Sequence, residues 1–274
     1  MCLLLIAYRQ HPHYPLVMLA NRDEFYRRPT APAQLWQERA ITAGRDLEAG
    51  GTWLGMAPGG RVAAVTNIRE PGTPEPPNAQ SRGEIPLAFL SGTASPADFS
   101  TGLEGARYRG FNAVLFDHKV GAALVCAGNR HQPFALTPGV HGISNGAADA
   151  PWPKVTRGRE SLAALVAELP AQLDSEHFVA PAMALLADTL RAPIAQLPDT
   201  GVGRPMELAL SSIFVRIEPE DLAGESPISL SGGYGTRAST LVAVHRDGST
   251  HLWEQTYIDG QASGRLRHFS YPPT

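Results

Sequence analysis

Two short apolar segments at the start of the chain constrain its fold more than any other feature. Residues 2–8 and 15–20 are almost entirely apolar, and the polar segment 9–14 joins them. Runs of this length without capping residues are typical of strands buried on both faces, although a short buried helix gives the same periodicity. The sequence therefore predicts an opening hairpin of two buried strands, which ends abruptly at the polar residues 21–24.

The rest of the chain consists of short elements separated by many turns, because glycine and proline make up 51 of its 274 residues. The patterns predict further strands at 61–67, 111–116, 120–127, 239–245, 250–258 and 264–269, with a type I′ turn at Asp247-Gly248. They predict helices after a capping box at Ser81–Glu84, from Pro96, over 159–169 and after Ser175. Since strands and helices come in segregated groups, we expect an α+β fold in a single domain over residues 1–274.

The composition excludes several classes of protein. Charged residues are only 18% of the chain and the formal net charge is −3, so no basic footprint for nucleic acid is present. The apolar run near the start is far shorter than a membrane span, and no cationic leader precedes it, so we expect a cytoplasmic protein without a membrane span. The two cysteines and scattered histidines form no metal motif, and Cys126 in an apolar strand is interpreted as structural.

Cys2 follows the initiator methionine directly and is the first candidate for chemistry. Removal of Met1 would leave a thiol and a free α-amine on one residue. The amine, with a pKa near 7.7–8.0, could accept the proton of the thiol, so one residue would supply both nucleophile and general base. The alternative is a small buried residue that opens a strand.

The quartet Asn21-Arg22-Asp23-Glu24 is the second candidate. If the first two strands pair as a hairpin, the quartet lies near the end of the sheet that carries Cys2. Asp23 could then orient the α-ammonium, and Arg22 could favour a thiolate or an oxyanion. The alternative is a solvated turn with an internal ion pair of little energetic value.

Asn67 ends a predicted strand, and Asn145 lies in the segment 142–146. Each side chain carries an amide NH₂ that could stabilise an oxyanion, although asparagine is also a common turn residue. Arg237 follows a glycine-rich segment that lacks the lysine and the helix of a phosphate loop. It fits better as an electrostatic or substrate-orienting cation, or as an ordinary arginine at a strand edge.

These motifs together resemble the NRDE family, also called the transport and Golgi organisation protein 2 family. The resemblance rests on Met1-Cys2, the segments 21–24, 51–55 and 65–67, and the segment 235–240. That family in turn resembles the N-terminal nucleophile hydrolases of the cholylglycine hydrolase and penicillin V acylase branch. The resemblance implies a four-layer αββα sandwich of two antiparallel sheets.

The same resemblance implies roles for individual residues. It makes Cys2 the nucleophile with Asp23 beside it, and it puts Asn67 and Asn145 near the oxyanion. It makes Arg237 the late cation. In that branch an arginine stands three residues before the aspartate. Here Ala20 occupies that position and the arginine is Arg22, next to Asp23.

Three functions from different classes remain open at this point. The first is a cysteine amidohydrolase that cleaves a linear, non-peptide amide of a small molecule through an acyl-enzyme and requires no cofactor. The second is a non-catalytic protein that binds and traffics haem or an acylated lipid or acyl-CoA in the same pocket, as the family association with haem trafficking and lipid homeostasis implies. The third is an interaction scaffold, which would show an exposed apolar patch.

Overall fold

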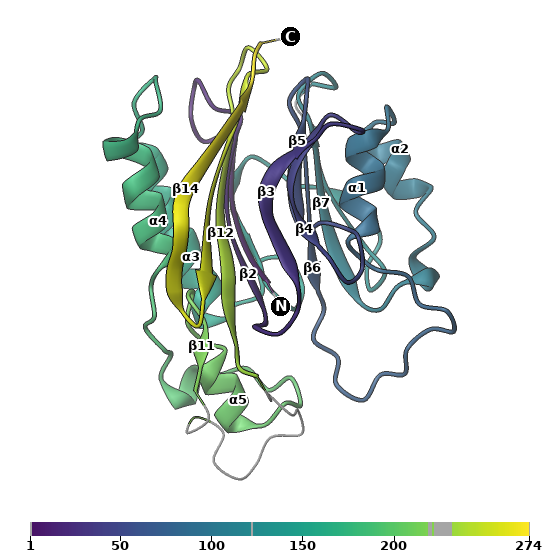
Figure 1. Cartoon of the computed structure of the whole chain (residues 1–274), viewed down its shortest axis with the longest axis vertical. Coiled ribbons are helices and arrows are strands. Elements are labelled where there is room, and N and C mark those ends of the chain that lie inside the picture. Colours follow the sequence, from purple (N-terminus) through teal and green to yellow (C-terminus); the bar gives the residue numbers. More distant parts are fainter. Residues whose placement is uncertain (1, 122, 219–220, 222–231, 274) are drawn as a thin grey trace.

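The computed structural model describes residues 2–121, 123–218, 221 and 232–273, with Cys2 described by its main chain. Two antiparallel sheets face each other across the centre of the molecule (Figure 1). Sheet A has the order β10-β1-β2-β12-β13-β14, with β11 also paired to β12. Its strands are β1 (Cys2–Tyr8), β2 (Leu16–Phe25), β10 (Gly139–Ile143), β11 (Arg216–Ile217), β12 (Tyr234–Val244), β13 (Thr250–Ile258) and β14 (Gln261–Tyr271).

Sheet B runs in chain order from β3 to β9. Its strands are β3 (Thr30–Trp36), β4 (Ile41–Asp46), β5 (Leu54–Ala57), β6 (Arg61–Asn67), β7 (Phe111–Asp117), β8 (Ala123–Gly128) and β9 (Phe134–Ala135). Every neighbouring pair is antiparallel.

Helices cover the outer face of each sheet (Figure 1). Sheet A is covered by α3 (Pro153–Ala167) and by α4 (Ala180–Leu186), which follows a π-helical turn at Ser175–Val179. Sheet B is covered by α1 (Glu84–Ser91) and α2 (Pro96–Thr101). The remaining helix α5 (Arg204–Ala209) and the 3-10 turns Gly105–Arg107 and Ile194–Gln196 lie in connections. This arrangement confirms the αββα sandwich.

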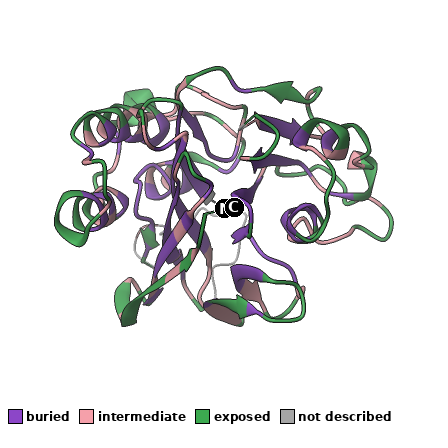
Figure 2. Ribbon diagram, turned by 90° about the horizontal axis from the view of Figure 1, so that it is seen from above, coloured by how far each residue is buried: buried purple, intermediate pink, exposed green. Residues whose placement is uncertain are grey.

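The core lies between the sheets and under the helices, as the buried residues of Figure 2 show. Successive residues of β2 alternate between these two layers: Met18 and Ala20 pack between the sheets, whereas Val17 and Leu19 pack under the helices of sheet A. A strand between two apolar layers reads as a continuous apolar run. The predicted hairpin of doubly buried strands is therefore confirmed.

Three local predictions need correction. The quartet at residues 21–24 is not a solvated turn, because β2 continues through it with β1 on one side and β12 on the other. The predicted capping box fails, because α1 begins at Glu84 and has no side-chain cap. The turn around Asp247 is not type I′, because only Gly248 has a positive φ there and type I′ requires two.

The helix predicted over 159–169 is correct in type but begins six residues earlier, at Pro153. Ser95 caps α2 as predicted, with its hydroxyl accepting the N–H of Asp98. None of the helices in the described residues is both long enough and apolar enough to cross a membrane.

Candidate functional site

A cavity of about 510 Å³ lies at one end of the two sheets, where polar and charged side chains replace the apolar ones of the core. Its walls come from the end of β2, the segment that follows β4, the end of β6 and the long loop that precedes α1. Of its 19 lining residues, four are arginines and five are carboxylic acids, namely Arg22, Arg28, Arg82 and Arg109 with Asp23, Glu24, Asp46, Glu48 and Glu75. Such a lining suits a polar or charged ligand.

The first described residue of the chain pairs with a strand residue that lines this cavity. The main chain of Cys2 pairs with Arg22 in the β1–β2 register, and Leu3 pairs with Asn21. The amine of a chain that begins at Cys2 is therefore the main-chain nitrogen of a residue in register with Arg22, one position from Asp23.

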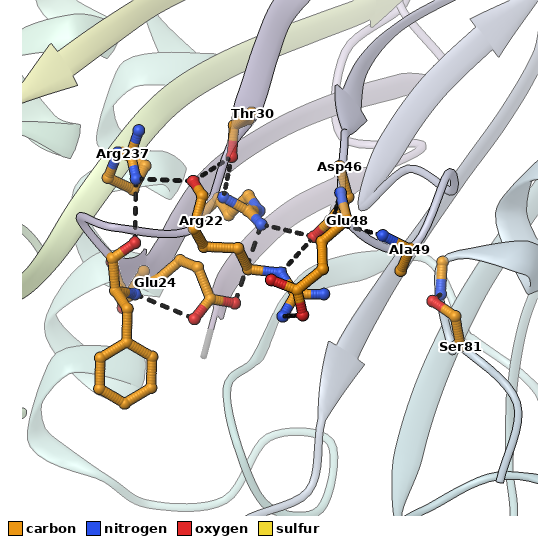
Figure 3. A network of polar contacts seen from close by, with 12 residues as sticks. Arg22, Glu24, Thr30, Asp46, Glu48, Ala49, Ser81 and Arg237 are labelled. Carbon is orange, nitrogen blue, oxygen red and sulfur yellow. Dashed lines mark hydrogen bonds and ion pairs between the residues drawn. The ribbon is translucent and has the colours of Figure 1, made fainter. Parts of the chain in front are cut away.

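The side chain of Arg22 points between the sheets, into a network of carboxylates (Figure 3). Its Nη2 donates to Oδ2 of Asp46 over 3.0 Å and lies 3.8 Å from Glu24. Its guanidinium also lies over the ring of Trp53, 4.5 Å from the centroid. Arg28 donates to the same oxygen of Asp46 over 2.6 Å. Burial alone would raise the pKa of Asp46, but these arginines and the N–H of Ala49 hold it below its usual value.

Asp23 points to the opposite face of sheet A, toward the helices. It is fully buried, and its Oδ1 accepts the hydroxyl of Thr236 over 2.8 Å. Burial raises the pKa of Asp23, while the positive charges of Lys154 and Arg69 and the bond from Thr236 oppose that rise. Adjacent strand residues face opposite sides, so Arg22 and Asp23 cannot share one layer of the sandwich.

A β-bulge at Arg237 arranges the neighbouring strand around these two residues. The register shifts so that Thr236 faces Asp23 and Ala238 faces Arg22, and Arg237 is the extra residue between them. Its Nη1 donates to the carbonyls of residues 25, 26 and 28, and so holds the turn between β2 and β3. Arg237 does not line the cavity among the described residues.

The two predicted asparagines meet at one end of sheet B. Asn145 is buried, and its Nδ2 donates to the carbonyl of Asn67 over 2.8 Å. The carbonyl of Asn145 in turn accepts the N–H of Arg69 over 2.7 Å. Only Asn67 lines the cavity, and its side-chain amide makes no hydrogen bond within the described part of the chain. Asn67 is therefore the asparagine with an amide available to a ligand, and Asn145 holds its main chain.

The remaining member of the quartet is structural. The side chain of Asn21 donates to the carbonyls of Leu186 and Ile213 over 2.8 and 2.9 Å, and accepts the hydroxyl of Ser239 over 2.6 Å. It thus joins β2 to the helical layer, which satisfies a buried polar group completely.

Sequence reasoning missed a group of charges behind Asp23. Arg69 donates to Oε2 of the buried Glu207 over 2.7 Å and lies over the ring of Trp152, 5.3 Å from its centroid. Lys154 is buried in the first turn of α3. Pro153 marked this helix start in the sequence, since proline favours the first helical position, but no local pattern indicated that the lysine would be buried.

The glycine-rich segment around Trp53 makes room for the inner network. A side chain on Gly44 would lie 2.2 Å from ring atoms of Trp53, and one on Gly51 would lie 2.5 Å from the main chain of Gly83. These glycines let the Trp53 ring and the loop before α1 approach closely. The Trp53 ring then lies where the guanidinium of Arg22 stacks on it.

The architecture has a counterpart among solved structures. A C2A mutant of conjugated bile acid hydrolase from Clostridium perfringens superimposes with a TM-score of 0.50 at 9% identity, covering 99% of this chain and 97% of that one. At this level of identity the similarity shows the fold alone, which is like that of the N-terminal nucleophile hydrolases.

Sequence comparison gives the family. The family described as Transport and Golgi organisation 2 matches residues 1–259, and the chain belongs to it. The human Transport and Golgi organization protein 2 homolog is 31% identical over 96% of this chain and 95% of its own. The Drosophila melanogaster Transport and Golgi organization protein 2 is 27% identical over 93% and 92%.

Proposed function

We propose that the protein is an N-terminal cysteine amidohydrolase that cleaves a linear amide of a small polar molecule after Met1 is removed. The main support is the arrangement at one end of the sandwich: the strand start at Cys2 pairs with Arg22, the carboxyl of Asp23 is buried one position further along β2, and the available amide of Asn67 lines the cavity. The hydrolase fold and the family membership agree with this proposal without establishing an activity.

The proposed reaction has two balanced halves. The α-amine of Cys2 accepts the thiol proton, the sulfur bonds to the amide carbon, and the carbonyl electrons move to the oxygen near Asn67. Collapse of this oxyanion breaks the carbon–nitrogen bond, and the leaving nitrogen takes the proton from the α-ammonium. Water then gives a proton to the α-amine and its oxygen attacks the thioester. The sulfur leaves and recovers that proton, so an amide and water become a carboxylic acid and an amine.

The protein groups around the cavity divide the remaining roles. Asp23 orients the α-ammonium in the step where it carries the proton, because its carboxylate is fixed by Thr236. The inner arginines and carboxylates select a substrate with complementary charges. Asn145 and Arg237 hold main-chain segments in place. The side chain of Asn145 donates to the carbonyl of Asn67, and that of Arg237 donates to the carbonyls of the turn after β2.

The second candidate, a haem or acyl-lipid binding protein, gains less support from the cavity. Its lining is dominated by charged and polar side chains, whereas long apolar ligands need apolar walls. Among the described lining residues none is a histidine or a methionine that could ligate a haem iron. The residues present therefore fit haem poorly.

Two measurements test the hydrolase proposal. Intact mass of the protein purified from cells should show a chain that begins at Cys2, and a retained Met1 would remove the general base and overturn the mechanism. An electrophilic amide or acyl probe should then label Cys2 in a Cys126→Ala background and fail to label Cys2→Ala. Cys126 is a suitable thiol to remove because it is buried and its pKa is raised to about 12 by burial and by Asp149. Titration with haem is the parallel test, in which an unchanged Soret band counts against the second candidate.

A further inference from the structure

A buried ion pair holds the chain directly after the end of β6. Asn67 is the last residue of that strand, and residues 68–83 then form a loop, of which 71–75 are exposed. Two residues beyond the strand end, Arg69 donates through Nη1 to Oε2 of Glu207 over 2.7 Å. The side chains of Arg69 and Glu207 are only 6% and 2% exposed. The loop is therefore fixed at its start by a charge pair inside the protein.

Both partners of this pair have further contacts that fix them. Glu207 belongs to α5, and Thr200 donates its main-chain N–H and its hydroxyl to Oε1 of Glu207 over 2.7 and 2.5 Å. Nη1 of Arg69 also donates to the hydroxyl of Thr200 over 3.2 Å. The guanidinium carbon of Arg69 lies over the ring of Trp152, 5.3 Å from the centroid. The pair is thus a defined structure rather than a loose contact of two charges.

Two hydrogen bonds connect this ion pair to the cavity. The main-chain N–H of Arg69 donates to the carbonyl of Asn145 over 2.7 Å. The side chain of Asn145 donates in turn to the carbonyl of Asn67 over 2.8 Å. One buried asparagine therefore binds both ends of the segment 67–69, and Asn67 lines the cavity.

A buried ion pair is a poor source of stability by itself. The cost of removing two charges from water can exceed their attraction, and apolar residues of similar volume often stabilise a protein equally well. Loss of one partner is nevertheless strongly unfavourable, because the other charge is left buried alone. Such a pair therefore holds its two segments in one arrangement. Next to Asn67 that arrangement has a use, since a donor to an oxyanion must be in place before the charge develops.

We propose that Arg69 and Glu207 are positioning residues of the proposed hydrolase: their buried ion pair fixes the segment after β6 so that the side-chain amide of Asn67 is held in place to donate to the oxyanion. This inference rests on the proposed function. Neither residue of the pair lines the cavity as far as the structure describes it. Arg69 acts through its main-chain bond to Asn145, and Glu207 acts through Arg69. Loss of the pair should then slow the steps that form an oxyanion.

Two reagents separate oxyanion formation from simple reactivity of the thiol. In acylation by p-nitrophenyl acetate the sulfur of Cys2 bonds to the ester carbon, a tetrahedral oxyanion forms, and p-nitrophenolate leaves when it collapses. In alkylation by iodoacetamide the sulfur displaces iodide directly, so no oxyanion forms. The thiol proton passes to the α-amine in both reactions. The ratio of the two rate constants, measured in the Cys126→Ala background and corrected with Cys2→Ala, therefore reports on the oxyanion donor.

The same strand provides a matched control pair. Arg61, at the start of β6, forms an ion pair with Asp117 on β7, and their side chains are 11% and 4% exposed. Within the described part of the chain neither of these two residues lines the cavity. Arg61→Met and Arg69→Met thus each leave a buried carboxylate without its arginine, at opposite ends of one strand.

The single variants give the first comparison. Asn67→Ala should lower the acylation-to-alkylation ratio by about 10²-fold, the loss expected for one oxyanion donor. Arg69→Met should lower it by about tenfold, because Asn67 is still present but is misplaced. Arg61→Met should also lower the melting temperature but keep the ratio within about twofold, because distant sites act independently. An unchanged ratio in Arg69→Met, or an equal fall in Arg61→Met, would overturn the proposal.

A double variant separates the position of Asn67 from the stability of the protein. Arg69→Met combined with Glu207→Gln leaves no uncompensated charge, so it should regain at least half of the melting temperature lost in Arg69→Met. The anchor is still absent, so the ratio should stay low. A ratio that recovers together with the melting temperature would show that it followed stability alone, and would overturn the proposal.

The outcomes distinguish this inference from the proposed function. If p-nitrophenyl acetate acylates Cys2 of the parent protein no faster than a free thiol, or if Asn67→Ala leaves the ratio unchanged, the hydrolase proposal and this inference are both overturned. A ratio that falls in Asn67→Ala and is unchanged in Arg69→Met overturns the inference alone.

Discussion

Arg22 and Asp23 are neighbours in sequence, yet they belong to different layers of the protein. Arg22 lies between the sheets, where Asp46 and Glu24 surround its guanidinium. Asp23 lies under the helices of sheet A, where the hydroxyl of Thr236 donates to its carboxyl. The two side chains point to opposite faces of the strand, so they do not form an ion pair with each other. β2 therefore places two charged residues, with separate surroundings, on opposite faces of sheet A beside the start of β1.

This difference assigns the two residues to different tasks. In the outer layer the carboxyl of Asp23 is fully buried, and in the proposed reaction it acts on the amine of Cys2. The inner layer opens onto the cavity and contains the groups that a ligand would meet. Substitutions in the outer layer should then change the reactivity of Cys2, whereas substitutions in the inner layer should mainly change stability and ligand binding.

The largest expected effect follows from Asp23→Asn. Loss of the carboxylate that orients the amine should lower the rate of Cys2 labelling by about 10³-fold, the middle of the range for a general acid–base contribution. The rate constant of labelling should be measured with the same probe at a pH where the rate no longer rises with pH. Asn21→Ala serves as the control, because it changes a buried structural residue next to the site. Labelling that is equally fast in Asp23→Asn would mean that Cys2 is an ordinary exposed thiol.

The inner layer also contains a carboxyl that titrates near neutral pH. Glu254 on β13 is buried, and it accepts the N–H of Ala33 on β3 over 2.5 Å and the hydroxyl of Thr240 over 3.3 Å. Burial raises the pKa of Glu254 from 4.5 to about 7. A raised pKa means that the folded protein binds this proton more tightly than the unfolded chain. The resulting stability is complete below pH 4.5 and is lost as the pH rises through about 7.

Glu254→Gln should remove this dependence. The variant should match the parent protein at pH 4.5 and exceed it above pH 8, where the difference approaches about 3 kcal/mol from the shift in pKa. Melting temperatures of both proteins at four or five pH values between 4.5 and 9 measure it. Parallel melting curves across that range would show that the carboxyl of Glu254 does not titrate with a raised pKa.

These residues also show how far a sequence alone could lead. The doubly buried hairpin followed from apolar runs, and the layer order followed from the family resemblance. The role of Asp23 could be expected from the same resemblance. Its layer could not, because that depends on β12 pairing with β2 from more than 200 residues away, and on the bulge at Arg237.

Long-range partners account for most of what the sequence could not show. Lys154 stands in an ordinary helix start, and only the packing of α3 on sheet A buries it. From the sequence, both asparagines were equally good candidates for the donor to the oxyanion. The structure shows that the side-chain amide of Asn145 already donates to the carbonyl of Asn67. A local pattern indicates a residue's chemistry, whereas its partner comes from the tertiary fold.

Arg22→Ala tests the inner layer, where we expect a loss of stability and little change in Cys2 labelling. Loss of the guanidinium removes the contact with Asp46 and the stacking on Trp53, while Arg28 still neutralises Asp46. We expect a destabilisation of about 2 kcal/mol, below that for an uncompensated buried charge. Cys2 labelling should stay within about tenfold of the parent rate. Chemical denaturation measures the first value and the probe the second, and a loss of labelling as large as in Asp23→Asn would refute the separation of the two layers.

The smallest expected effect concerns Arg237, the bulged residue that both layers share. Its guanidinium donates one nitrogen to three carbonyls of the β2–β3 turn, so Arg237→Ala should cost about 1–2 kcal/mol through unsatisfied main-chain acceptors. The matched control is Arg246→Ala, an exposed arginine in the hairpin turn at the other end of β12, which should leave the melting temperature unchanged. Because the bulge sets Thr236 against Asp23, the variant should also slow Cys2 labelling slightly, by about threefold. A loss of labelling without any loss of stability would instead make Arg237 a cation that meets the substrate, as the family resemblance implies, and would move it from the framework of the site into its chemistry.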